Sequence, residues 1–396
     1  MLRDISPELL AKVRHVGQPF LHRRWVQHCG TNTIAEGNED VLHQGDDETV
    51  SSLGIGRWRL HQVLWEATQE AGIPIYFEKA IEDIVQLTHD INDGNTDQDL
   101  VRVHFADDTH RLGHLLLGTD GTWSSTRQLV LRDDNHHRQH KLESTGVTCL
   151  MGIALDCPKS DVGVCCPTST TTQCHAIYFP TLEYEQCFQL YFPLAHGDAN
   201  ADTWGTLSEQ VGKEECYVLC ETLRADGWDE KYCQPLAQVT RAVQIGFCEI
   251  QPPLERWAYG RVVLLGDAAH PPVPYTGQGA QMGLEDAGTI AVLLERYCCL
   301  QRAKNENDDG TTLHWDGLAA ALDKFQALRI PRVAEIQKYS HQMGEMQQKQ
   351  AECRKYARKQ AMKLQRDVFF HQTSPLMIPG AQYDFQIEVQ KAFSST

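Results

Sequence analysis

The residues best suited to chemistry lie in one stretch, from Arg261 to Ala287. It opens with the continuous apolar run 262–265, which is typical of a parallel strand buried on both faces. Gly266 and Asp267 follow directly. Such a strand would deliver Asp267 to its carboxyl end, where the ligands of α/β sheets collect. There the carboxylate could accept hydrogen bonds from a ribose hydroxyl.

A glycine-rich loop and a helix complete the stretch. Gly277 and Gly279 would let the backbone approach a ligand closely. The N-terminus of the next helix would then point at the same place, and its unpaired N–H groups suit a phosphate or another delocalised anion. A plain strand, turn and loop without a ligand would also explain a lone pair of glycines.

The whole stretch resembles the GDAAHxxxPxxGqG…eDA signature of class A flavoprotein monooxygenases, the FAD-dependent aromatic hydroxylases of the salicylate hydroxylase type. The resemblance implies that FAD is the cofactor. It implies that Asp267 binds the ribitol or ribose side of FAD and that Pro274 shapes the loop beside the flavin's reactive edge. The same resemblance marks these positions as cofactor-binding: Gly266, Asp267, Pro274, Gly277, Gln278, Gly279 and Ala280. The flavin carries the chemistry, so no catalytic residue is assigned, and His270 is expected to be a structural hydrogen-bonding histidine.

Two further segments resemble the same family. Residues 115–127 are similar to its DG motif, which implies that Asp120 lies near the cofactor pyrophosphate and the nicotinamide nucleotide. Residues 57–64 look like its R-x-x-L helix start, which implies that Arg57 contacts the flavin nucleotide.

One part of the family pattern is missing. The family begins with a βαβ unit that carries GxGxxG and a later acid, and this sequence has neither. We expect the absent strand to belong beside 262–265. Two interpretations remain: the sequence omits an upstream segment, which we favour, or the chain is a degraded relative that does not retain FAD.

The remaining elements are predicted from periodicity. Apolar residues at helical spacing predict a helix over 57–71 and, after the signature, a second helix with the stripe Ala280, Leu284, Ala287, Ala291 and Leu294. Residues 73–77 are typical of a short strand, and 101–117 of a hairpin that feeds a buried strand. Short antiparallel strands are expected between 147 and 250.

The predicted fold is α/β: a Rossmann-like FAD/NAD(P)-binding domain, N-terminally truncated, with an inserted antiparallel-sheet substrate domain. The predicted ranges are 1–145 and 253–345 for the two parts of the FAD-binding domain, 146–252 for the substrate domain, and 346–396 for a C-terminal helical tail. That tail carries a basic run, 349–366, most simply a solvated helix face.

Composition excludes several classes of protein. The chain has 396 residues and a net charge of −17, which argues against nucleic acid as a partner. No apolar stretch is long enough to span a bilayer and no secretory signal is evident, so a cytoplasmic location is expected. The 14 cysteines are read as mostly free and buried. A metal site is not expected, because the candidates Cys165, Cys166, Cys174 and His175 match no common zinc spacing.

The resemblance implies a reaction in which NADPH or NADH reduces FAD and one oxygen atom of O2 passes to a small aromatic or polyketide-like substrate. The alternatives are another flavin oxidoreductase of this fold, such as an epoxidase or halogenase, and a non-catalytic relative. The substrate pocket is expected between the middle sheet and the flavin. Its candidate wall residues are Tyr178, Phe179, Phe188, Tyr191 and Phe192.

Overall fold

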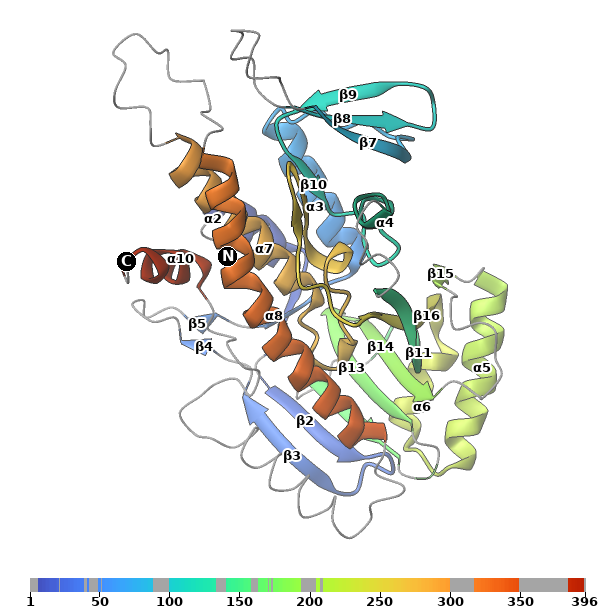
Figure 1. Ribbon diagram of the computed structural model, residues 1–396. Coiled ribbons are helices and arrows are strands. Elements are labelled where there is room, and N and C mark those ends of the chain that lie inside the picture. The colour runs from blue at the N-terminus through green and yellow to red at the C-terminus, as the bar shows by residue number, and fades with distance from the viewer. Residues whose placement is uncertain are drawn as a thin grey trace, which may run out of the picture.

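The computed structural model describes residues 6–20, 22–38, 41–42, 49–50, 52–87, 100–132, 140–157, 163–169, 171, 174–193, 204–206, 209–299, 317–348 and 384–394 (Figure 1). The helices are α2 (Pro7–His15), α3 (Arg57–Glu70), α4 (Ser125–Arg132), α5 (Glu209–Ala225), α6 (Glu230–Ala237), α7 (Gly279–Leu294), α8 (Leu318–Gln348) and α10 (Phe385–Ser394). Shorter turns are the 3-10 segments η2 (Gly266–Ala268) and η3 (Pro274–Thr276) and the π-helical η4 (Glu295–Cys299).

The strands form one large sheet and four small ones. The large sheet has the order β15-β16-β11-β14-β13-β12-β2-β3, and the others are β10-β18-β17, β7-β8-β9, β1-β6 and β4-β5. Their bounds are β1 (Gln18–Phe20), β2 (His22–Gln27), β3 (Thr33–Asn38), β4 (Val41–Leu42), β5 (Thr49–Val50), β6 (Ser52–Gly54), β7 (Ile81–Leu87), β8 (Leu100–Phe105), β9 (His110–Gly113), β10 (Leu116–Gly118), β11 (Lys141–Leu155), β12 (Gly163–Thr168), β13 (His175–Leu182), β14 (Glu185–Pro193), β15 (Trp204–Thr206), β16 (Val239–Gln251), β17 (Ala258–Tyr259) and β18 (Val262–Leu264).

The buried strand predicted at 262–265 forms as β18, the central strand of the sheet β10-β18-β17. Every residue of β18 is fully buried. It pairs in parallel with β10 on one edge and antiparallel with β17 on the other. β18 belongs to a hydrophobic core that includes Met282 and Leu293 of α7 and Phe325 of α8, all of them fully buried. These contacts hold the segment after β18 against α7.

The prediction that an absent strand belongs beside 262–265 is wrong for this structure, because β10 and β17 occupy both edges of β18. β10 pairs only with β18 among the described residues. The strand predicted at the end of the 101–117 hairpin forms as β10, but it is not fully buried, since Leu117 is 41% exposed.

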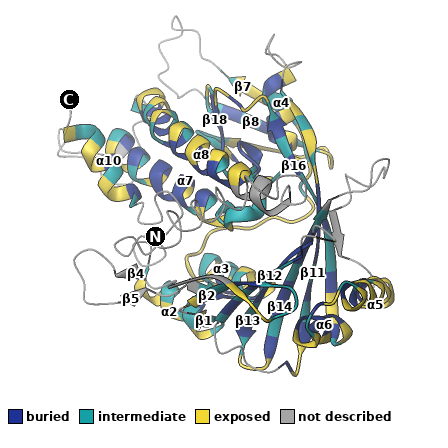
Figure 2. Cartoon of the chain, turned by 90° about the horizontal axis from the view of Figure 1, so that it is seen from below, coloured by how far each residue is buried: buried dark blue, intermediate teal, exposed yellow. Residues whose placement is uncertain are grey.

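The large sheet forms the lower part, and α5 and α6 cover one of its faces (Figure 2). β11 and β16 are its longest strands, and they pair from Lys141–Gln251 to Ala154–Val239. The sheet is mostly antiparallel, as expected, but β12 and β2 pair in parallel. β2 and β3 lie within the range 1–145, so this sheet takes strands from outside 146–252.

Three predicted elements differ from the structure. Residues 73–77 form no strand, because nothing in the described part of the chain pairs with them; Ile73 and Phe77 are 57% and 69% exposed. The range 147–250 also contains the helices α5 and α6, and α5 buries Cys216, Cys220 and Leu223 at helical spacing.

The predicted stripe of α7 is the third difference. Ala280, Ala287 and Ala291 are exposed, whereas the buried face carries Met282, Glu285, Asp286, Thr289, Ile290 and Leu293. The periodicity predicted the wrong buried face of α7 because acidic residues are ordinarily exposed. Here Glu285 and Asp286 are buried, and each forms an ion pair with Arg329.

The twelve cysteines whose side chains the structure describes are all free, and ten of them are buried, which confirms the expected thiol state for these residues. Cys165 and Cys166 are neighbours on β12 and face opposite sides of the sheet; Cys165 lies on the side of Cys174 and Cys166 on the other, so the four candidates do not converge on one point. Within the described ranges, no cluster of three or more metal-ligating side chains occurs. In the same ranges, no helix is both long enough and apolar enough to cross a membrane. The basic run 349–366 lies outside them.

Candidate active site

Asp267 lies directly after β18, in the turn η2, where the sequence predicted it. Gly266 adopts a left-handed conformation with φ of 57°, which allows the chain to turn sharply here. Burial raises the pKa of Asp267, and the nearby His270, a hydrogen bond from Thr122 and the charge of Arg57 act in the opposite direction. Three segments far apart in the sequence therefore meet at this carboxyl group: the start of α3, the loop after β10 and η2.

Arg127 fixes two of these segments to each other. Its side chain is buried, and Nη1 donates to the Ala268 carbonyl at 2.8 Å while Nη2 donates to the Thr122 carbonyl at 2.6 Å. Burial lowers its pKa, and the charge of Asp120 works against that shift. The guanidinium thus clamps the loop after β10 onto the loop after β18.

Asp120 uses its carboxylate within its own loop. Oδ1 accepts from the Ser124 hydroxyl at 2.6 Å, and Oδ2 accepts from the Thr126 backbone N–H at 2.9 Å and hydroxyl at 3.0 Å. These bonds cap the first turn of α4. In this structure Asp120 shapes the loop that presents Thr122 to Asp267.

The loop that leads into α7 has the geometry of an anion site. Pro274 opens η3, and Gly277 closes it with φ of 64° and open space where a side chain would stand. No side chain caps the N-terminus of α7, and its first turn holds no acid. The N–H groups around Gln278, Gly279 and the exposed Ala280 can therefore meet a negatively charged ligand.

η2 and α7 are held together by close backbone packing and by a buried carboxylate. A Cβ on Gly266 would lie 3.6 Å from the Cα of Gly283, so the two segments nearly touch. Asp286 Oδ2 accepts from the Gly266 N–H at 2.8 Å and faces His270 Nε2 at 2.7 Å. His270 thus makes the kind of contact expected of a structural histidine.

A buried ionic cluster anchors Asp286 from the other side. Arg329 of α8 donates to Asp286 Oδ1 at 2.7 Å and to Glu285 Oε2 at 2.6 Å, and Arg332 donates to Glu285 Oε1 at 3.1 Å. Burial opposes ionisation of Asp286, but His270, Arg329 and the Gly266 N–H together lower its pKa. The cluster therefore holds an ionised carboxylate under the Gly266 turn.

Tyr275 joins the loop before α7 to the large sheet. Its ring lies 5.9 Å from that of Tyr191 on β14, which in turn lies 6.0 Å from Phe247 on β16. The Tyr275 hydroxyl is buried without a hydrogen-bond partner, and burial raises its pKa. An aromatic wall thus stands between the sheet and η3.

Only part of the predicted pocket wall faces this side. Tyr191 does, whereas Tyr178, Phe188 and Phe192 pack into the core between the sheet and α5 and α6. Phe179 lies on the same face as Tyr191, because it alternates with Tyr178 along β13, and it packs with Trp25 and Val164 near β12. The prediction was wrong for three of five residues because neighbours in a strand alternate between the two faces of a sheet.

A second link connects α3 to the sheet. Arg59 donates to both carboxylate oxygens of Glu185 on β14, at 2.6 and 2.8 Å. This hydrogen bond to Arg59 lowers the pKa of Glu185. Because Arg59 is two residues from Arg57, the pair fixes where α3 begins and hence where Arg57 lies.

The residues present fit one end of FAD. The open Gly277 turn and the uncapped start of α7 suit the polar edge of a flavin ring, and Asp267 with Arg57 beside it suits the polyol and phosphate that follow. For the adenosine end, the sequence has no GxGxxG motif.

Sequence reasoning missed four supporting residues: Arg59, Arg127, Asp286 and Arg329. The sequence contained two patterns that could have indicated Asp286 and Arg329. Acids at 285 and 286 stand in an otherwise apolar helix, and the arginines at 329 and 332 are spaced to share one helix face. Arg127 gave no such signal, because its partners are backbone carbonyls.

Comparison with known proteins points in one direction. A family model described as "FAD binding domain" matches residues 16–305. The chain is 26% identical over 247 residues to 3-amino-4-hydroxybenzoate 2-monooxygenase of Streptomyces cremeus, covering 62% of this chain and 53% of that protein. It is 25% identical over 322 residues to 3-hydroxybenzoate 6-hydroxylase 2 of Aquipseudomonas alcaligenes, covering 80% and 86%.

Among solved structures, Klebsiella pneumoniae HpxO, crystallised with FAD and uric acid, superposes with a TM-score of 0.65 at 17% identity, over 92% of this chain and 81% of HpxO. That similarity supports the fold. The chain spans about half the length of the first curated relatives it matches.

Proposed function

The chain belongs to the FAD binding domain family, and from this membership we propose that it is an FAD-dependent monooxygenase that hydroxylates a small aromatic or polyketide-like substrate. The observation that carries the proposal is the buried carboxyl group of Asp267, which bonds to Thr122 and lies within electrostatic reach of Arg57, in a turn packed on α7, whose N-terminus is uncapped. Relatives named as hydroxybenzoate monooxygenases support the aromatic substrate class.

FAD would supply the redox chemistry when bound, with NADPH or NADH as the reductant and O2 as the oxygen source. Asp267 and Arg57 would hold the polyol and phosphate of the cofactor. The N–H groups of Gln278, Gly279 and Ala280 would stabilise negative charge on the flavin ring through the helix dipole. Asp120 would act through the loop that it caps.

The protein would also orient the substrate and exclude water. Pro274 opens η3, and the Tyr275, Tyr191 and Phe247 rings would form an apolar wall beside the flavin edge. An aromatic substrate matches such a wall, because stacked or tilted aromatic contacts bury large flat surfaces.

The competing function is a relative that does not retain FAD, and a specific observation favours it: the sequence lacks GxGxxG. The visible absorption spectrum of the purified chain, with and without added FAD, separates the two. Flavin bands that stay with the protein through gel filtration support the monooxygenase. A chain that stays colourless contradicts it as the activity of this chain.

Asp267→Ala and Arg132→Ala are the matched variants for this test. Loss of the Asp267 carboxylate should weaken FAD binding by about 10- to 100-fold, the range for a hydrogen bond to a charged group. Arg132 pairs with Asp83 at an exposed site outside the cofactor residues, so its variant should bind FAD normally. If the wild type binds FAD, consumption of NADPH or NADH with 3-hydroxybenzoate, and the hydroxyl, epoxide or halide found in the product, tests the reaction class.

A further inference from the structure

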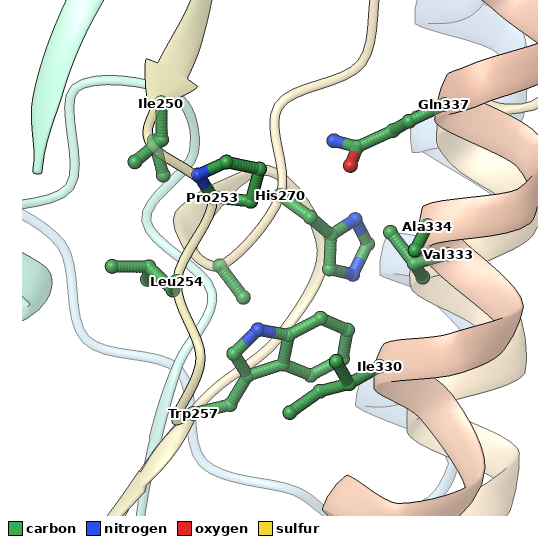
Figure 3. Close-up of a pocket in the computed structure, with 10 residues that line it drawn as sticks. Ile250, Pro253, Leu254, Trp257, His270, Ile330, Val333, Ala334 and Gln337 are labelled. Atoms are coloured by element: carbon green, nitrogen blue, oxygen red, sulfur yellow. The ribbon is translucent and has the colours of Figure 1, made fainter.

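The recess between α8, η2 and the segment that joins β16 to β17 offers a ligand almost no accessible surface (Figure 3). Trp257 and His270 at its base are 2% and 4% exposed, and Gln337 is the other polar side chain in its lining. A ligand from solution therefore reaches no polar atom deep in this recess. Accessible groups that could bind a ligand lie instead on the small sheet β7-β8-β9, in the upper part of the molecule in Figure 1.

Two histidines face each other on this sheet. His104 of β8 and His110 of β9 are paired directly across the two antiparallel strands. The next pair along the hairpin is joined by a backbone hydrogen bond, from the Phe105 N–H to the Thr109 carbonyl at 2.9 Å. Because hydrogen-bonded and non-hydrogen-bonded pairs alternate in an antiparallel ladder, the histidines form a non-hydrogen-bonded pair, in which side chains approach most closely. The two imidazoles therefore lie side by side on one face of the hairpin.

Both rings can be reached from solution. His110 is exposed and His104 is half-buried. Within the described ranges neither ring makes a hydrogen bond, and Asp83, which lies opposite His104 on β7, uses its carboxylate to accept from Arg132 at 2.8 Å. A neutral imidazole has one ring nitrogen with a free lone pair, so each of the two rings can supply one ligand to a metal ion.

The pair also has the spacing of two ligands of one ion. Two imidazole nitrogens that bind the same ion at about 2.0–2.1 Å lie about 3–4 Å apart. The ring centres are 5.8 Å apart, which allows that spacing once rotation about the side-chain bonds turns one nitrogen of each ring toward the other. Imidazole ligands favour Zn²⁺, Cu²⁺ and Ni²⁺, whereas Mg²⁺ and Ca²⁺ prefer oxygen ligands. The chemistry of the pair therefore selects a late transition metal.

We propose that His104 and His110 together bind one divalent late transition-metal ion, such as Ni²⁺ or Zn²⁺, and that this ion ties β9 to β8. No group of three or more candidate ligands occurs among the described residues, so water molecules complete the coordination. β9 leads within a few residues into β10 and the loop that carries Thr122, so the ion would also fix the start of that connection. The site uses none of the residues assigned to FAD and does not depend on the proposed function.

Hydrogen exchange of the full chain without added flavin tests the proposal. NiCl2 is added up to about 1 mM at about pH 8, where an imidazole is neutral. An ion that bridges the two strands should slow exchange over 100–113 in the wild type, and MgCl2 at the same concentration should have no effect there. Equal slowing by both salts would mean that the ions only screen the acidic chain, and no slowing by NiCl2 would mean that the pair binds no such ion. Either result would overturn the proposal.

Two variants locate the ion. His104→Gln and His110→Gln each remove one ligand and keep a polar side chain at an accessible position. Each should bind Ni²⁺ about 100-fold more weakly at this site, because the second imidazole no longer adds to the first. A single imidazole cannot bridge the strands, so the slowing over 100–113 should be lost in both variants.

His61→Gln is the matched control, because it removes an exposed histidine of α3 and should leave the nickel effect on 100–113 unchanged. Slowing that persists in His104→Gln or His110→Gln would place the ion elsewhere in the chain and contradict the assignment. Since no flavin is present in these measurements, such a failure would leave the proposed function standing.

Discussion

Asp267 is a proposed FAD-binding residue, and its burial also lowers the stability of the folded protein. Its pKa is raised because burial disfavours the charged carboxylate. A raised pKa for an acid means that the folded state is penalised at every pH above the unfolded value, here 3.8, and that the penalty vanishes below it.

Asp267→Asn should therefore raise the melting temperature of the flavin-free chain at pH 7, and the difference should shrink to nothing as the pH falls toward 4. Melting curves of both proteins between pH 4 and pH 8 measure this. The same variant should bind FAD more weakly. A variant that is less stable than the wild type at pH 7 would show that Asp267 contributes net favourable contacts in the absence of FAD.

Two tyrosine hydroxyls on the aromatic wall differ in a way that makes a matched pair. Tyr191 donates to Gln189 Oε1 at 2.7 Å, whereas the buried Tyr275 hydroxyl has no partner. Tyr191→Phe should cost about 1 kcal/mol of unfolding free energy, and Tyr275→Phe should be neutral or stabilising. Urea unfolding of the two variants checks the order. An equal loss in both would mean that the Tyr275 hydroxyl also has a partner in solution.

At the scale of elements, α7 is fixed by two different kinds of contact. One is the buried ionic cluster with α8, in which Arg329 and Asp286 are fully buried and Glu285 is nearly so. Removing one partner of such a cluster strands a buried charge. The other contact is apolar: α10 packs on α7 through Phe385.

Arg329→Met should destabilise the protein by about 3–5 kcal/mol at pH 7, because it removes the guanidinium that bonds to both buried acids and leaves Glu285 with Arg332 alone. In the wild type the lowered pKa of Asp286 means that its contribution is present above the unfolded value of 3.8 and is lost as the pH falls below it. The stability gap between variant and wild type should therefore narrow in acid. Arg132→Met breaks only an exposed pair and is the control. A gap independent of pH would assign the loss to packing rather than to charge.

Gly288 is the point where α10 meets α7. A Cβ there would lie 2.8–2.9 Å from three ring atoms of Phe385, so the ring must move. Gly288→Ala should loosen α10 while leaving β18 and η2 intact. Faster hydrogen exchange over 385–394, with unchanged exchange over 262–268, is the expected result. Gly72→Ala, at a glycine in open space, serves as a control for general effects, although its positive φ carries a small cost of its own. Exchange that rises everywhere would show that α10 supports the whole upper part.

The local sequence pattern correctly predicted the elements whose formation depends mainly on their own residues. Helix α3 and the β8–β9 hairpin follow from spacing and turn residues, and β18 follows from its apolar run. The strand expected at 73–77 needed a neighbour to pair with, and the face of α7 was decided by Arg329 and Arg332, some forty residues away. The glycine-rich signature placed Asp267 and the start of α7 because each lies within a few residues of the strand. Its supporting contacts, such as Arg127 with Ala268, join positions 141 residues apart and leave no local pattern.

At the scale of the whole molecule, the dominant long-range interaction is repulsion among the excess negative charges. The chain carries 53 Asp and Glu against 36 Lys and Arg, and a net charge of −17 repels itself in the compact state. Exposed charges feel this repulsion over a Debye length that shortens from about 30 Å at 0.01 M salt to about 8 Å at 0.15 M. Buried pairs such as Arg329 with Asp286 are screened far less.

Sodium chloride should therefore stabilise the protein at pH 7 rather than weaken it. We expect the melting temperature to rise by a few degrees between about 0.01 and 0.15 M salt and then to level off, because screening saturates once the Debye length is shorter than the spacing of surface charges. Sodium sulfate separates this effect from exclusion of salt at the surface, which grows with concentration and does not level off. Scanning calorimetry across both salt series makes the comparison. A melting temperature that falls as chloride is added would mean that exposed ion pairs, such as Arg224 with Glu221 and Glu230, outweigh the net repulsion.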